Sequence, residues 1–224
     1  MSKKTIIGVV IAIILIIVAV IGYVLLGNAS KNDTTKTNRE NNNSQLAQTN
    51  NNIATNNVAE QPVNNDSKVL IVYFSETGNT EKFANIIHEQ IGGDLFKIEP
   101  VTPYPTGEEL FDYTKQEQDE DRRPEIQGTV DISQYDTIFI GYPIWWYEVP
   151  QIIKTFLDTY DLSGKTIIPF NTHEGSGDGG TYDYIAEQEP NATMLEGLPI
   201  RGGNMEQDQT SRISNWLKDL GFEV

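Results

Sequence analysis

The sequence predicts an α/β domain over residues 68–224, with a parallel sheet between helices on both faces. From Lys68 onward, short apolar runs alternate with amphipathic stretches of helical periodicity. Three of the apolar runs lead into loops rich in hydroxyl, aromatic or glycine residues, and ligands bind open α/β sheets at such loops. We therefore expect a three-layer sandwich, preceded by segments of a different kind.

The first two elements show the pattern most clearly. The run Val69–Phe74 is apolar throughout, as in a strand buried on both faces. Asn79–Gln90 predicts a helix, with Phe83 and Ile87 on its inner face. The other expected strands are Leu95–Ile98, Thr137–Gly141, Thr166–Phe170 and a fifth beginning at Thr193–Leu195; the other expected helices are Thr106–Asp121, Pro150–Tyr160, Thr181–Gln188 and Gln207–Leu220. Five strands joined through helices form a parallel sheet, for which we expect the order 2-1-3-4-5.

The first 67 residues divide into two segments. Residues 1–27 contain an uncharged apolar run of about 21 residues, Ile6–Leu26, which is long enough to cross a membrane as a helix. We interpret this run as a membrane anchor; a cleaved signal peptide is the alternative. Because Lys3 and Lys4 precede it, we expect the domain outside the cytoplasm. Residues 28–67 are rich in Asn, Thr, Gln and Ser, which predicts a disordered linker.

Composition excludes several classes of function. The formal net charge is −16 and no Lys- or Arg-rich stretch offsets it, which argues against a nucleic-acid partner. The chain has no cysteine, so disulfides, thiolate metal sites and a cysteine nucleophile are excluded. We predict neither a metal site nor catalytic residues. An acidic surface also suits a protein partner with a basic docking face, although it equally keeps a domain soluble.

The loop after the first strand predicts an anion site. Ser75–Thr80 runs directly into a helix, so backbone N–H groups and three hydroxyls can converge at a helix N-terminus. The loop has no Lys or Arg, which separates it from the triphosphate-binding loop, and it lacks the GxGxxG spacing of dinucleotide sites. A single phosphomonoester bound by neutral donors fits best; helix capping by Ser and Thr is the alternative.

Two further loops border the same predicted edge. The segment Gly141–Tyr147 carries three consecutive aromatic residues, of which at least one ring should be exposed, where a planar ligand could stack on it. The segment Asn171–Gly180 is rich in glycine, which lets its backbone approach a ligand, and His173 could stack on that ligand or hydrogen-bond to it.

These motifs resemble the flavodoxin-like proteins of bacteria. The resemblance lies in Tyr73–Thr80, in Gly141–Trp146, and in the stretch from Gly164-Lys165 through Pro169-Phe170 into the third loop, and it covers about residues 68–224. It is closest to the subfamily whose second loop reads GYPIWW. Flavodoxin is itself a standard example of ligand binding at the strand-order switch point, so the placement of the loops is not independent support.

The resemblance implies a bound FMN. It implies a phosphate site at Ser75, Thr77, Gly78, Asn79 and Thr80. It implies that the flavin ring is lined by Pro143, Ile144, Trp145, Trp146 and Tyr147, with Trp145 as the stacking ring, and is bordered on its other side by Thr172, His173, Glu174 and Gly175.

Two functions follow from this interpretation. The first is a membrane-tethered electron carrier whose partner is a redox protein or a small electron acceptor at the membrane. The alternative is an FMN-dependent NAD(P)H:quinone-type oxidoreductase, which needs room above the flavin for a hydride donor.

Overall fold

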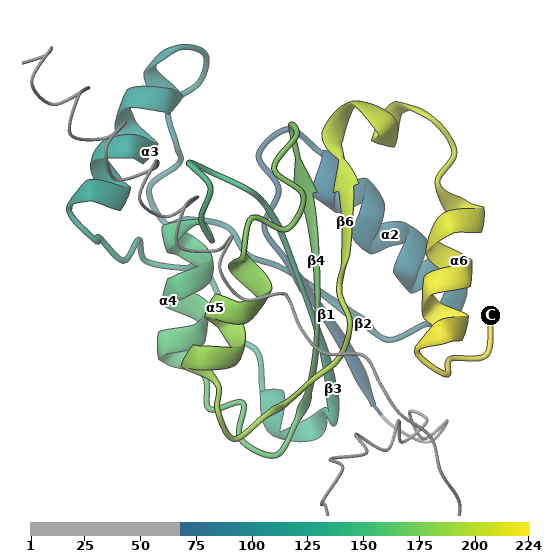
Figure 1. Ribbon diagram of the computed structural model, residues 1–224. Coiled ribbons are helices and arrows are strands. Elements are labelled where there is room, and N and C mark those ends of the chain that lie inside the picture. Colours follow the sequence, from purple (N-terminus) through teal and green to yellow (C-terminus); the bar gives the residue numbers. More distant parts are fainter. Residues whose placement is uncertain (1–67) are drawn as a thin grey trace, which may run out of the picture. The chain divides into compact units, whose positions relative to one another are not determined.

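The computed structural model describes residues 68–224, and a parallel sheet runs through the middle of this range (Figure 1). The strands lie in the order β2-β1-β3-β4-β5, and a further short strand, β6, also pairs with β4. The predicted order 2-1-3-4-5 is confirmed. The strands are β1 (Val69–Tyr73), β2 (Asp94–Lys97), β3 (Thr137–Pro143), β4 (Thr166–His173), β5 (Thr193–Met194) and β6 (Leu198–Arg201).

Helices cover both faces of this sheet. In Figure 1, α4 and α5 lie against one face with α3 beside them, and α2 and α6 lie against the other. The helices are α2 (Asn79–Ile91), α3 (Glu109–Asp119), α4 (Gln151–Thr159), α5 (Thr181–Gln188) and α6 (Thr210–Asp219). The predicted sandwich is therefore present.

The two N-terminal segments predicted from the sequence, the membrane helix at 1–27 and the linker at 28–67, lie outside the described residues. Among the helices of residues 68–224, none combines the length and the apolar character that crossing a membrane requires.

Successive residues of a strand pack into two separate hydrophobic cores. In β1, Leu70 and Val72 pack in the core under α4 and α5, whereas Ile71 and Tyr73 pack under α2 and α6. Side chains alternate between the faces of a strand, so a strand covered on both sides must be apolar at every position. This requirement explains why β1 and β3 are continuous apolar runs in the sequence.

The fifth strand is interrupted, and its second half was missed by the prediction that began a strand at Thr193–Leu195. β5 pairs with the start of β4, and β6 pairs with its end. Between them stands Pro169 of β4, which has no N–H to donate on the side facing the fifth strand. Gly197 lies at the break, where an added Cβ would be 2.6 Å from the Pro169 carbonyl oxygen.

Two helix starts differ from the prediction. α3 begins at Glu109 rather than Thr106. Gly107 has a φ of +70°, a left-handed backbone conformation that cannot be part of a right-handed α-helix. α6 begins at Thr210 rather than Gln207, because the Asp208 carboxylate accepts the Thr210 N–H at 2.8 Å and fixes the first turn there. The residues before it, Gly202–Glu206, form a short 3₁₀ helix.

Gly141 of β3 has no room for a side chain. An added Cβ would lie 2.1 Å from Cζ of Phe170 on β4, its partner in the strand register. We expect Gly141→Ala to lower the free energy of unfolding by about 1–3 kcal/mol, because overpacking forces strand or ring to move. Gly203→Ala is the matched control, since nothing lies within 4 Å of its added Cβ. Urea unfolding followed by circular dichroism compares them, and equal stabilities would contradict the tight contact.

Candidate functional site

Three loops meet at the carboxyl edge of the sheet. They are the first loop (74–78) after β1, the second loop (144–150) after β3 and the third loop (174–180) after β4. The register places Tyr73 beside Gly141 and Pro143 beside Thr172, so the three strands end at the same edge. The Ile144 N–H also donates to the Thr172 carbonyl oxygen at 2.8 Å, which ties the second loop to β4.

The first loop leaves the N-terminus of α2 without a side-chain cap. Gly78, with a φ of +86°, turns the chain into the helix, and no side chain hydrogen-bonds to the first-turn N–H groups. Ser75 and Asn79 are half-buried here and Thr77 is exposed. The donor set therefore consists of backbone amides and neutral side chains at the positive end of a helix dipole, which suits an anion.

A hydroxyl contact joins the first turn of α2 to the end of β4. Thr80 is buried in the first turn of α2, and its Oγ1 lies 2.9 Å from Oγ1 of the buried Thr172 on β4. Both residues belong to the predicted set, and the structure brings them together.

The segment after β6 forms a further wall that the sequence analysis missed. An added Cβ on Gly202 would lie 2.6 Å from Glu174 Oε1 and 3.0 Å from Asn79 Nδ2, so these side chains lie against its backbone. Glu174 Oε2 is 3.7 Å from Nε of Arg201, and both side chains are exposed. The sequence feature that could have indicated this wall is the apolar run at 198–200, which is followed by Arg-Gly-Gly.

The second loop makes a strained two-residue turn. Trp145 and Glu148 exchange backbone hydrogen bonds of 3.2 and 2.9 Å, which leaves Trp146 and Tyr147 at the tip. Their φ values are +52° and +64°, the signs of a type I′ turn that favours Asn and Gly. Tyr147 is 77% exposed and Trp146 is 40% exposed. Large aromatic side chains in this backbone conformation indicate a functional role for the loop.

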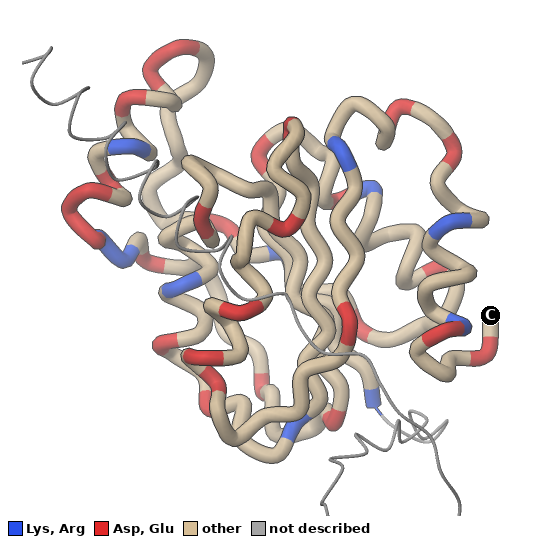
Figure 2. Tube along the Cα trace, viewed as in Figure 1, with Lys and Arg blue, Asp and Glu red and all other residues tan. Residues whose placement is uncertain are grey.

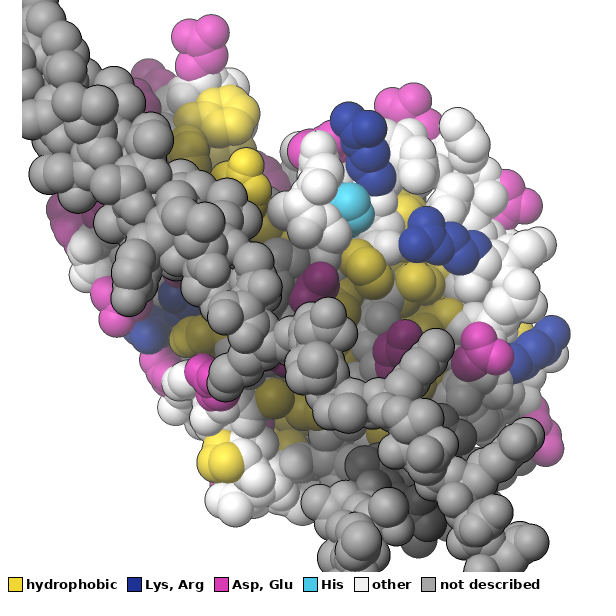
Figure 3. Space-filling model, in the orientation of Figure 1, with side chains coloured by type: hydrophobic (Ala, Val, Ile, Leu, Met, Phe, Trp, Pro, Cys, Tyr) yellow, Lys and Arg dark blue, Asp and Glu magenta, His cyan; other side chains and the backbone are white. Residues whose placement is uncertain are grey.

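The two tryptophans lie in different surroundings. Trp145 is half-buried and packs edge-to-face against Phe74 and Tyr104, with ring centroids 5.2 Å apart in each pair. Trp146 donates its Nε1–H to Thr114 Oγ1 of α3 at 3.0 Å. Tyr147 is therefore the most exposed ring of the three. Figure 3 shows hydrophobic side chains and charges of both signs on the face in view.

The third loop is held by its own side chains. Nδ1 of His173 accepts the N–H groups of Gly175 at 2.9 Å and of Gly177 at 3.2 Å. Buried Asn171 donates from Nδ2 to the Gly177 carbonyl oxygen at 3.0 Å and accepts the Tyr182 hydroxyl. His173, expected to face a ligand, thus uses one ring nitrogen to shape the loop.

Nδ1 can accept these bonds only while it carries no proton. Desolvation lowers the pKa of His173; the Glu174 carboxylate opposes this shift, and the Arg201 and Arg212 cations add to it. The neutral ring is therefore the form that the fold stabilises.

Among residues 68–224, no group of three or more acidic or histidine side chains could hold a metal ion.

Comparison with known proteins gives consistent matches over this domain. Residues 68–220 match the family model described as Flavodoxin. A flavodoxin from Haemophilus influenzae is 28% identical over 150 residues, which are 61% of this chain and 71% of that protein. A crystal structure from Bacteroides eggerthii DSM 20697, assigned as a flavoprotein, is 33% identical with a TM-score of 0.63, covering 70% of this chain and 100% of that one.

A flavoprotein from Lactobacillus acidophilus NCFM, solved in complex with FMN, has a TM-score of 0.54 and is 23% identical. The match covers 62% of this chain and 97% of that one. At this identity the likeness shows the fold alone.

The third loop should respond to pH through His173. Because its pKa is lowered on folding, His173 stabilises the fold above its ordinary pKa, and this contribution is lost as the pH falls through the folded value. We expect the wild type to lose more unfolding free energy than His173→Gln between about pH 7.5 and about pH 5. His88→Gln, at the other histidine of the chain, removes a ring that lies outside the three loops and is the comparison variant. If the unfolding free energy of His173→Gln fell with pH as steeply as that of the wild type, this role would be contradicted.

Proposed function

The chain belongs to the flavodoxin family, and from this premise we propose that residues 68–224 bind FMN and that the protein carries electrons at a membrane. The proposal depends on one observation, the meeting of three loops at the carboxyl edge of the sheet. The first loop offers neutral donors at an uncapped helix N-terminus, and the second offers aromatic rings. FMN combines a phosphomonoester with a planar ring and matches both features.

The phosphate would be held by the first loop. The backbone amides around Gly78 and Asn79 and the hydroxyls of Ser75, Thr77 and Thr80 are the groups proposed to contact it. The uncapped amides of α2 support this assignment, because a buried or half-buried N–H needs a partner. No basic side chain is present in this loop, so the helix dipole supplies the favourable charge.

The flavin ring would lie between the second and third loops. Pro143, Ile144 and the aromatic tip of the second loop are proposed to line one side, and Thr172, Glu174 and Gly175 the other. The Tyr147 carbonyl oxygen lies 3.6 Å from an added Cβ on Gly179, so the second and third loops come close together at their tips. When bound, FMN accepts and donates electrons one at a time.

The N-terminal segments are proposed to hold the domain outside the cytoplasm. The support is the apolar run Ile6–Leu26 behind two lysines, followed by the polar stretch at 28–67. Protease treatment of intact cells tests this orientation, because an inward-facing domain would survive it.

The partner is proposed to be a redox protein with a basic docking face, or a small acceptor. Acidic side chains outnumber basic ones 32 to 16 in the chain, and Figure 2 shows them on α3 and the loop after it as well as over the rest of the domain. Complementary charge speeds the encounter of two proteins, which suits a carrier that must bind and leave quickly.

Thr77→Val tests the phosphate site, because this exposed side chain can be changed without disturbing the core. We expect FMN to bind about tenfold more weakly, since a hydrogen bond to a charged group is worth about 1.5–3 kcal/mol. Riboflavin, which has no phosphate, should bind the wild type and Thr77→Val equally. Thr106→Val, an exposed threonine outside the loops, is the matched control. Equal FMN affinities in all three proteins would contradict the assignment.

An anaerobic absorption spectrum distinguishes the carrier from the reductase. The full-length protein with added FMN is titrated with NADH, NADPH and dithionite. A carrier should bleach with dithionite alone, whereas rapid bleaching by a nicotinamide would identify an FMN-dependent NAD(P)H oxidoreductase. Absence of bound flavin would contradict the FMN proposal altogether.

A further inference from the structure

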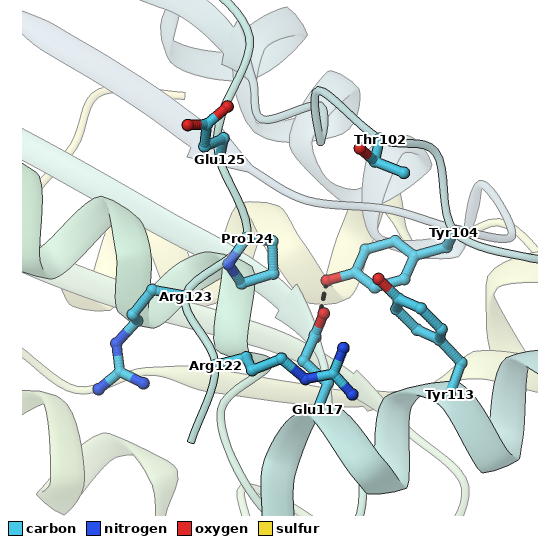
Figure 4. A pocket seen from close by; sticks show the side chains of 8 residues that line it. All are labelled: Thr102, Tyr104, Tyr113, Glu117, Arg122, Arg123, Pro124 and Glu125. Carbon is cyan, nitrogen blue, oxygen red and sulfur yellow. Dashed lines mark hydrogen bonds between the residues drawn. The ribbon is translucent and has the colours of Figure 1, made fainter. Parts of the chain in front are cut away.

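A second cavity lies apart from the three loops, in the segment between β2 and β3. It has a volume of about 320 Å³, which is the size of small-molecule sites. Figure 4 shows Tyr104, Tyr113, Glu117 and Arg122 grouped together at its wall. No residue of the three loops lines it, so the proposed FMN site does not account for it.

Arg122 has two buried donor atoms that make no hydrogen bond. Its Nε and Nη2 atoms are shielded from solvent and make no hydrogen bond, although the whole side chain is 38% exposed. The Glu120 carboxylate forms an ion pair with this guanidinium, with Oε2 2.9 Å from Nε, but neither Nε nor Nη2 makes a hydrogen bond. Nε and Nη2 lie along one edge of the guanidinium group, so the two N–H groups form a fork that can bind an oxygen acceptor. Buried donors of this kind call for a ligand.

Two tyrosine rings form part of the cavity wall. The rings of Tyr104 and Tyr113 meet at 83° with centroids 5.8 Å apart, which makes an aromatic corner. The Arg122 guanidinium lies over the Tyr113 ring, 5.5 Å from its centroid. A planar ring would find both a stacking surface and a hydrogen-bond donor here.

The charge of the cavity favours a neutral ligand. Buried Glu117 accepts the Tyr104 hydroxyl at 3.0 Å, and Glu125 also lines the cavity. Together with Glu120 these carboxylates outweigh the Arg122 cation, so an anion would be repelled. Arg123 does not change this balance, because it points away in Figure 4 and its Nε donates to Asp158 at 2.6 Å.

We propose that this cavity binds a neutral planar carbonyl compound of the quinone class, with the carbonyl oxygen on the Arg122 fork and the ring against Tyr113. Tyr104 also contacts Trp145, so a bound quinone would lie one ring layer behind the second loop. The role of this quinone as the membrane-soluble electron acceptor rests on the proposed function. Its binding in the cavity does not.

Calorimetry with menadione tests the site on the full-length chain without FMN, so failure of FMN binding leaves the result unaffected. We expect one menadione per chain, and about tenfold weaker binding by Arg122→Lys, which keeps the charge but loses the fork. Arg212→Lys, the same change on an exposed residue of α6, is the matched control and should bind as the wild type.

Thr102→Phe gives a second test, because Thr102 lines the cavity yet is exposed, so the larger ring should fill the space without disturbing the core. It should weaken menadione binding as well. Naphthoate, a carboxylate with the same two-ring frame, should not compete. Equal menadione binding by the wild type, Arg122→Lys and Thr102→Phe would overturn the proposal, as would competition by naphthoate.

Discussion

β3 pairs with β1 along one side and with β4 along the other, and the three loops can meet only because of this pairing. The tightest point is Gly141, whose α-carbon leaves room for the Phe170 ring. That ring in turn packs on Phe83 of α2, with centroids 4.8 Å apart. One set of contacts therefore holds β3 against β4 and holds α2 against the sheet. Because the N-terminus of α2 supplies the proposed phosphate site, the position of that site depends on the packing beneath it.

The backbone of the second loop is strained. Trp146 and Tyr147 both have positive φ, at a cost on the order of 1–2 kcal/mol for each residue. The turn is fixed from both sides: Trp146 donates to Thr114 on α3, and Glu148 accepts from the buried Lys154 at 3.0 Å. A relaxed loop with Asn-Gly at the tip would present no rings. The strained turn keeps aromatic surface at the edge of the site, where a planar cofactor needs it.

Sequence reasoning succeeded where burial alone decides the structure. Strands such as β1 and β3 are covered on both faces, so their residues had to be apolar and the runs were visible. It missed β6 because Pro169 interrupts the ladder and leaves two fragments too short to show a period. It also could not predict that the His173 ring would accept two amides of its own loop. That bond depends on where the loop folds back, which neither composition nor spacing specifies.

The cavity and the proposed flavin site share one aromatic layer. Trp145 stands edge-on between Phe74, the residue after β1, and Tyr104, whose other side meets Tyr113 in the cavity wall. Rings packed edge-to-face at about 5 Å cannot shift singly without opening a gap between them. A movement of Trp145 on binding a flavin would therefore be transmitted to Tyr104, and occupation of the cavity would restrain Trp145. Two ligands on this domain would be coupled through a single indole ring, and that coupling requires no change in the strands or helices that hold it.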